Sequence, residues 1–139
     1  MSDWSDPVTL LACAIATREG FFVPGSVPSI RNNPGDIRFA GQVGAVTPSA
    51  GSISAFGAPI ATFHSVALGT NALHRQLRAQ VASGQTVREI ISQWAPPDEN
   101  DTAGYLADVL HWTGLPADTP VLDLLPPLVK LSAPVARMS

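Results

Sequence analysis

The sequence predicts an α+β domain that is mostly helical, with a small β excursion after the first helix. Apolar residues recur at helical spacing in several segments, and each segment is bounded by a capping residue and by glycine or proline. Only two short runs, residues 37–40 and 59–63, have the composition of strands beside turn signals. A length of 139 residues without a repeat or linker predicts a single domain over residues 1–139, with a core of about 6–127 and a tail of 128–139.

The first helix is predicted from residue 7 to about residue 19. Asp6 and Pro7 have the residue types of an N-cap and a first helical position. The apolar stripe that follows consists of Val8, Leu11, Ala12 and Ile15. Continuing this stripe by four residues reaches Glu19, and Gly20 is a typical C-terminal stop. We therefore expect Glu19 on the buried face of the last turn. Cys13, the lone cysteine, is expected to pack as a small core residue.

The chain after the first helix is expected to be irregular until about residue 64. Residues 21–30 contain two prolines and a glycine, and residues 41–59 are rich in Gly, Ser and Ala and lack charge. The first stretch is therefore predicted to be irregular, and the second to be a loop or weak hairpin. A long helix is predicted over residues 65–83, with Leu73, Leu77 and Val81 on one face.

Three further helices are predicted in the C-terminal half. Thr86 and Glu89 form the pattern of a capping box, and that helix is expected to end before Pro96. Asn100 to Thr102 resemble the N-cap of the next helix, which should end at Gly114. A last helix is expected to start at Thr119 and Pro120.

Composition excludes several classes of function. Charged residues make up 14% of the chain and the net charge is −3, without a cluster of Lys and Arg, so no nucleic-acid partner is expected. No apolar run approaches the ~18 residues of a membrane span, so no membrane insertion is expected. The first twenty residues carry acids where a signal peptide has bases, which predicts synthesis in the cytoplasm without a signal peptide. The three histidines lack metal-ligand spacing and no phosphate-binding glycine loop is present, so neither a metal nor a cofactor is expected.

Glu19 is the strongest candidate for chemistry. Burial and the dipole at a helix C-terminus both disfavour the charged form of a carboxyl group and raise its pKa. Such a group can keep its proton near neutral pH and donate it to the oxygen of a glycosidic bond. The alternative is an ordinary helix-end residue paired with Arg18 or Arg31.

Several motifs together resemble one superfamily. They are IATREG (15–20), RNNPGDIRF (31–39), IATFHSVALGTNALHRQL (60–77), TVREIISQWAPPDENDTAGYLADV (86–109) and TGLPADTP (113–120). In this order they resemble the lysozyme-like superfamily, particularly phage and bacterial peptidoglycan hydrolases and lytic transglycosylases, over about residues 8–120. The resemblance implies a lysozyme-like fold. It also implies that Glu19 is the catalytic acid and base that cleaves the bond between N-acetylmuramic acid and N-acetylglucosamine. Hydrolysis and formation of a 1,6-anhydro product both remain open.

The same resemblance suggests a set of substrate-binding residues. They are Arg31, Asn32, Asn33, Asp36, Phe63, Asn100 and Tyr105. Asp36 is the candidate second carboxylate, at a place where family members often carry Asn, and its alternative role is turn formation. The amides of Asn32 and Asn33 suit sugar hydroxyl and N-acetyl groups, or else belong to the turn. For Tyr105 two roles are open: its hydroxyl group points into a cleft, or its ring is part of the core.

The expected partner is the peptidoglycan glycan strand. Without a signal peptide, the protein would act in the periplasm or cell wall after release or delivery, with a holin, a phage tail or a secretion apparatus as the delivering partner. A non-catalytic lysozyme-like module that binds glycan, or that serves a structural role in a phage or secretion machine, is the alternative. A small helical protein without a sugar ligand is a third reading.

Overall fold

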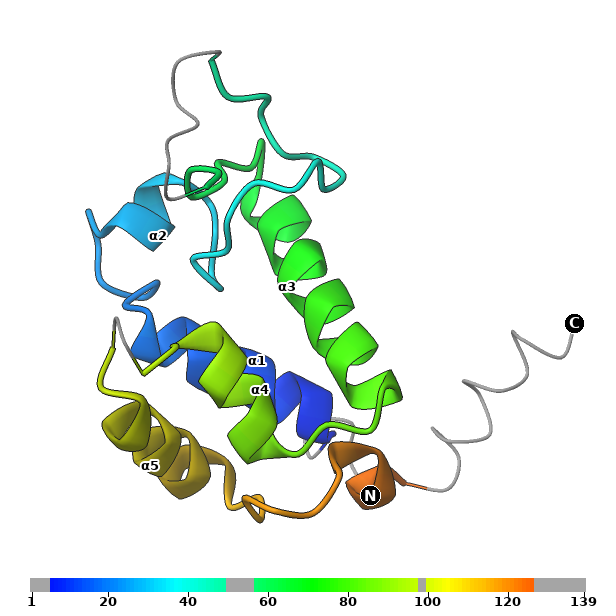
Figure 1. The fold of residues 1–139 in the computed structure, drawn as a ribbon. Coiled ribbons are helices and arrows are strands. Elements are labelled where there is room, and N and C mark those ends of the chain that lie inside the picture. Colours follow the sequence, from blue (N-terminus) through cyan, green and yellow to red (C-terminus); the bar gives the residue numbers. More distant parts are fainter. Residues whose placement is uncertain (1–5, 50–56, 98–99, 127–139) are drawn as a thin grey trace, which may run out of the picture. The chain divides into compact units, whose positions relative to one another are not determined.

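The computed structural model describes residues 6–49, 57–97 and 100–126, and it is mostly helical (Figure 1). Its elements are α1 (Pro7–Arg18), α2 (Val27–Ile30), α3 (Val66–Ala82), α4 (Val87–Trp94), α5 (Thr102–Thr113) and the 3₁₀ helix η3 (Val121–Leu124). The chain divides into two compact units. We call Ala12–Gln76 the turn unit and the described parts of Met1–Leu11 and Leu77–Ser139 the helical unit. The predicted tail 128–139 lies outside the described residues.

Helix α1 begins where its sequence predicts. Asp6 Oδ1 accepts a hydrogen bond of 3.2 Å from the Val8 N–H, as an N-cap does. All members of the predicted apolar stripe are buried. The prediction for Cys13 is wrong, because its side chain is exposed. At 100° per residue, position 13 lies across the helix from the buried Leu11 and Ile15.

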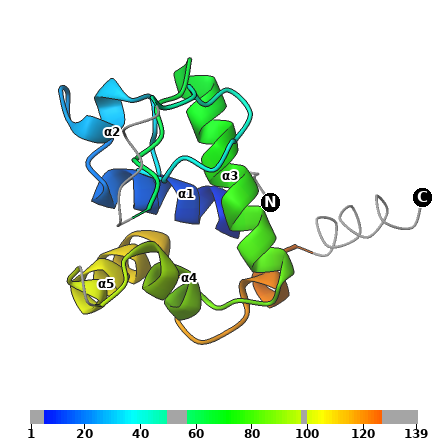
Figure 2. The same ribbon diagram turned by 45° about the horizontal axis from the view of Figure 1, so that its top comes forward.

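The helical unit is built from capped helices. Thr86 and Glu89 form the predicted capping box at the start of α4, and Asp101 caps α5 through the Gly104 N–H at 3.0 Å. Gly114 ends α5 in the left-handed conformation. Helices α4 and α5 contact one another and lie side by side in both ribbon views (Figures 1 and 2). The buried residues of the segment from α4 onward are Val87, Ile90, Ile91, Ala95, Tyr105, Leu106, Val109, Val121 and Leu125.

The last predicted helix is a single 3₁₀ turn, η3. Pro126 follows it closely and cannot donate the backbone hydrogen bond that would continue a helix. The turn is joined to the start of α4, since the Val121 N–H donates to the Gln85 carbonyl at 3.0 Å. The side chains of Arg88 and Asp118 add an exposed ion pair of 2.7 Å at the same junction.

In the turn unit, residues 27–30 form helix α2 where the sequence suggested irregular chain. Ser26 is its N-cap, and Ser26 Oγ accepts from the Ser29 N–H at 3.3 Å. The same hydroxyl donates to the Gly20 carbonyl at 2.7 Å. Pro28 in the first turn is compatible with a helix start, because an N–H there has no helical partner to lose. Ser26 therefore joins α2 to the end of α1.

The two predicted short strands pair with each other without forming a regular ladder. Arg38 and Ile60 make an isolated antiparallel bridge. Beside it, the Phe39 N–H donates to the Pro59 carbonyl at 2.8 Å and the Ala61 N–H donates to the Ile37 carbonyl at 2.9 Å. Within the described residues of this region, these bridges take the place of extended strands.

Helix α3 packs closely on the turn before these segments. A Cβ atom added at Gly69 would lie 1.8 Å from the backbone oxygen of Asn32. Only glycine permits this approach. The turn and the first part of α3 can therefore lie close to one another inside the turn unit.

Candidate functional site

Glu19 occupies the C-cap of α1. The Phe21 N–H donates to the Ala16 carbonyl at 3.0 Å, and the Gly20 N–H donates to the Thr17 carbonyl at 3.1 Å. With Gly20 at φ +83°, these two bonds make the Schellman motif that commonly ends helices. The Glu19 N–H itself donates to the Ile15 carbonyl at 2.9 Å. The backbone of Glu19 is therefore fixed by bonds on both sides.

Glu19 is half-buried. The last carbonyl groups of α1 carry the negative end of the helix dipole, which disfavours a carboxylate at this position. A surface helix gains more from a cation here, and α1 has Arg18 in its last turn. Glu19 is thus an acidic residue at a helix C-terminus, where the helix dipole favours a basic residue. The sequence predicted this position.

Asn33 is fully buried, with no exposed surface. Its Nδ2 donates to the carbonyls of Ile37 at 2.9 Å and Ala61 at 2.8 Å, and its Oδ1 accepts from the Ile37 N–H at 3.1 Å. Both ends of the amide are thus occupied by backbone groups. The expectation that Asn33 binds sugar is corrected, because a buried amide with its donors and acceptor in use has nothing to offer a ligand.

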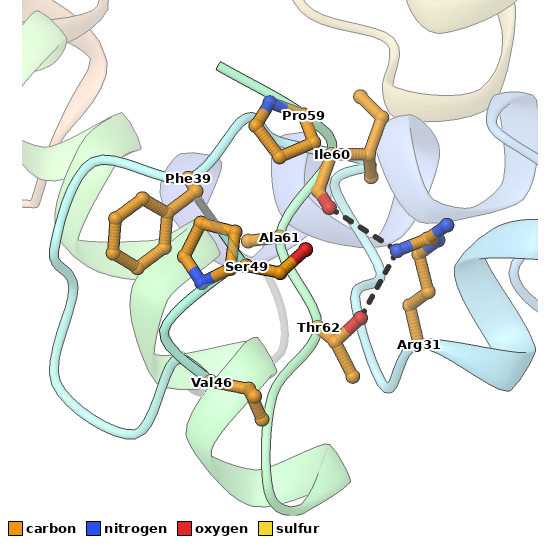
Figure 3. A pocket seen from close by; sticks show the side chains of 9 residues that line it. Arg31, Phe39, Val46, Ser49, Pro59, Ile60, Ala61 and Thr62 are labelled. Carbon is orange, nitrogen blue, oxygen red and sulfur yellow. Dashed lines mark hydrogen bonds between the residues drawn. The ribbon is translucent and has the colours of Figure 1, made fainter. Parts of the chain in front are cut away.

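Asn32 and Arg31 hold the same turn to residues 60–63. Asn32 Nδ2 donates to the Phe63 carbonyl at 3.0 Å. Arg31 Nη1 donates to the Ile60 carbonyl at 3.3 Å and to Thr62 Oγ1 at 3.1 Å (Figure 3). These two side chains are half-buried, so each keeps some contact with solvent. Three consecutive residues thereby attach the turn to one facing segment.

Phe63 is part of the core and not of a binding surface. Its side chain is 1% exposed, and its N–H donates to the Arg31 carbonyl at 2.9 Å. A sugar-binding aromatic residue needs an exposed ring face. The expectation that Phe63 contacts substrate is therefore corrected.

Asp36 combines a turn position with partial burial. It adopts φ +49°, a left-handed conformation that Asp and Asn tolerate better than most residues. Burial raises the pKa of the Asp36 carboxyl, while the charges of Arg31 and Arg38 act in the opposite direction. Its Oδ1 is buried and has no hydrogen-bond partner among the described residues. Asp36 is therefore more easily protonated than an ordinary surface aspartate.

The remaining predicted residues belong to the helical unit. Tyr105 is 5% exposed, and its ring is part of that unit's core. Asn100 is exposed, and its Nδ2 donates to the Pro96 carbonyl at 3.3 Å. The neighbouring Asp98 and Glu99 lie outside the described residues. Of the predicted set, the structure brings Glu19, Arg31, Asn32, Asn33, Asp36 and Phe63 into one unit.

Two pockets are found among the described residues of the turn unit. A smaller one of about 250 Å³ lies among Arg31, Phe39, Pro59 and Thr62 (Figure 3). A larger one of about 460 Å³ lies between residues 40–43 and one face of α3. Glu19 lines neither of them. The sequence did not point to the larger pocket, because the polar residues on α3 have the pattern of an ordinary solvated helix face.

The comparison with known proteins does not identify a relative. No protein-family model, no curated protein and no solved structure matches the chain. Within the described residues, no group of three or more His, Cys, Asp or Glu side chains is arranged to hold a metal ion. In the same part of the chain, no helix has the length and apolar character that crossing a membrane requires.

Proposed function

We propose that the protein is a lysozyme-like glycosidase that cleaves peptidoglycan, with Glu19 as its general acid and base. The observation that carries the proposal is the placement of Glu19. Glu19 is a half-buried acidic residue at the C-cap of α1, where its backbone is held by the Schellman hydrogen bonds. A catalytic acid must be held in one position, and these hydrogen bonds hold the backbone of Glu19 in place.

In this mechanism Glu19 protonates the glycosidic oxygen between N-acetylmuramic acid and N-acetylglucosamine. The resulting carboxylate then removes a proton from water, which gives hydrolysis, or from the C6 hydroxyl of the muramic residue, which gives a 1,6-anhydro product. Asp36 is the candidate second carboxylate of the same unit, although burial raises the pKa of its carboxyl group and thereby disfavours the charged form. Delivery to the wall by a holin, a phage tail or a secretion apparatus belongs to the same proposal.

The test is the clearing of purified cell walls by the wild type and by Glu19→Gln. We expect the wild type to clear the suspension and Glu19→Gln to lose at least about a hundredfold in rate, the lower end for removal of a general acid. Glu89→Gln is the matched control. It makes the same chemical change at an exposed acid of the α4 capping box, where Gln is also accepted. Equal rates for the wild type and Glu19→Gln would refute the role of Glu19.

Mass spectrometry of the released fragments then distinguishes the two reactions. A hydrolysed product carries one more water than an anhydro product. The measurement needs no further variant, because both reactions start from the same protonation by Glu19.

A non-catalytic glycan-binding or structural module is the second candidate, and specific observations favour it. Glu19 lines neither of the two pockets of the turn unit. Asn33 and Phe63 are buried in structural roles. This candidate predicts that the protein sediments with insoluble peptidoglycan but releases no fragment from it. Failure to sediment and to cleave would leave neither candidate standing.

A further inference from the structure

We propose that the larger pocket of the turn unit binds a short peptide that ends in a carboxylate and carries small apolar side chains. Such peptides are the chemical class of the peptide stems of peptidoglycan, and this identification of the source rests on the proposed function. The preference for a carboxylate and a peptide group does not rest on that function, because it follows from the residues that line the pocket.

The pocket has the size and construction of a small-molecule site. Its volume of about 460 Å³ falls within the range typical of ligand pockets, roughly 300–1,000 Å³, whereas the smaller pocket does not reach it. It is lined by Ala40, Gly41, Gln42, Val43, Leu68, Asn71, Ala72, Arg75 and Gln76. All of these residues belong to the turn unit, so one compact body carries the whole pocket.

Both walls of the pocket are formed by segments with internal hydrogen bonds. One wall is helix α3. The other is the segment 40–43, which Gln42 holds in shape because its Oε1 accepts from the Ala40 N–H at 2.8 Å and its Nε2 donates to the Arg38 carbonyl at 2.9 Å. The two walls meet where Gly44 approaches the side chain of Leu68. A preformed pocket loses less entropy on binding than a flexible one.

The polar side chains that α3 contributes to the pocket are unused, whereas Gln42 is engaged with its own segment. Asn71, Arg75 and Gln76 are exposed, and within the described residues their side chains make no hydrogen bond or ion pair. Asn71 and Arg75 are four residues apart, so they lie one above the other on the same side of α3. The pocket thus presents one guanidinium and two carboxamides to a ligand.

These groups define the chemistry of the ligand. No acidic residue is among those that line the pocket, so Arg75 gives it a single positive charge that complements one carboxylate. A carboxamide both donates and accepts, as a peptide group does, and therefore suits a peptide backbone. Ala40, Val43, Leu68 and Ala72 supply an apolar lining that suits methyl-sized side chains. A neutral sugar satisfies the amides but leaves Arg75 without its counter-charge.

The proposal is tested by titrating the ¹⁵N-labelled full chain with N-acetyl-trialanine and with its C-terminal amide, followed by NMR. The two probes differ only in the carboxylate. We expect the acid to bind in the millimolar range and about tenfold more tightly than the amide, which corresponds to one charge-assisted hydrogen bond at an exposed site. The shifted signals should belong to residues 40–43 and to α3.

Variants on the same helix make the assignment specific. Arg75→Gln should bring the affinity for the acid down to that for the amide, and Asn71→Ala should weaken both probes. Arg78→Gln is the matched control, since Arg78 is an exposed arginine of α3 that does not line the pocket. Equal binding of acid and amide to the wild type, loss of the difference in Arg78→Gln, signals elsewhere in the chain, or no binding by either probe would overturn the proposal.

A separate arm distinguishes this site from the proposed activity. N-acetylmuramyl-L-alanyl-D-isoglutamine, a fragment that joins sugar and peptide, should bind to the wild type and equally to Glu19→Gln. If it binds while cell walls are not cleared by the wild type, the pocket stands and the glycosidase proposal fails. If trialanine binds but the muramyl peptide does not, the carboxylate site stands and the wall peptide is excluded as its source.

Discussion

The helical unit and the turn unit differ in what several of their polar side chains do. In the helical unit, hydrogen bonds between near neighbours in sequence set the helix starts, as at Thr86 with Glu89 and at Asp101 with Gly104. In the turn unit, the side chains of Arg31, Asn32 and Asn33 reach backbone groups about thirty residues away. Polar side chains of this kind cap helices in both units, and in the turn unit they also take the place of a β-ladder.

The largest expected effect is at Asn33. Asn33→Ala removes three hydrogen bonds and leaves the Ile37 N–H and the Ala61 carbonyl without their partner. We expect the free energy of unfolding to fall by about 3–4 kcal/mol, measured by denaturant titration. Asn32→Gly is the control, because it removes one side-chain bond at φ +53° without backbone strain and should cost only about 1 kcal/mol. Equal losses in the two variants would contradict the central role given to Asn33.

A smaller effect is expected at the cap of α4. Thr86→Ala removes the acceptor of the Glu89 N–H and should lower the free energy of unfolding by about 1 kcal/mol. Thr86→Ser keeps the hydroxyl and should stay close to the wild type. The same denaturant titration measures both variants. If Thr86→Ala costs as much as Asn33→Ala, the distinction between local and long-range contacts in the two units is lost.

The smallest expected change in the free energy of unfolding is at Asp36, where the substitution should stabilise the protein. Because burial raises its pKa in the folded protein, the folded state holds the proton more tightly than the unfolded state. The free energy of unfolding therefore falls as pH rises from about 3.8, the pKa of the unfolded carboxyl group, through the higher pKa of the folded state. Asp36→Asn should be more stable than the wild type at pH 7, by less than about 1 kcal/mol since half of the group faces solvent, and the gain should vanish towards pH 3.

Asp118 is the matched control for this pH dependence. Its hydrogen bonds with Arg88 lower its pKa, so its contribution to stability is present above the unfolded pKa and is lost as pH falls. Asp118→Asn should therefore be slightly less stable than the wild type at pH 7 and equal to it in acid. Thermal unfolding of both variants between pH 3 and pH 7 gives the comparison. Parallel trends in the two variants would contradict the assignment of burial at Asp36.

The chain by itself determined most of the helices. Caps and stops act within four or five residues, so Asp6, Thr86, Gly20 and Gly114 mark helix boundaries that the structure confirms. The position of Glu19 at the end of α1 also follows from local pattern alone. Helix α2 was missed because a single turn has no periodicity to detect, although Ser26 was a usable signal.

Tertiary structure alone decided what the polar and aromatic residues of the turn unit do. Asn33 and Phe63 have residue types that suit both sugar binding and burial, and only the approach of residues 60–63 to the turn put them inside. The pocket beside α3 exists because residues 40–43 fold back onto that helix, a contact that no short window of sequence contains. Hydrogen bonds between neighbours are specified by spacing, whereas burial depends on which distant segment arrives to cover a side chain.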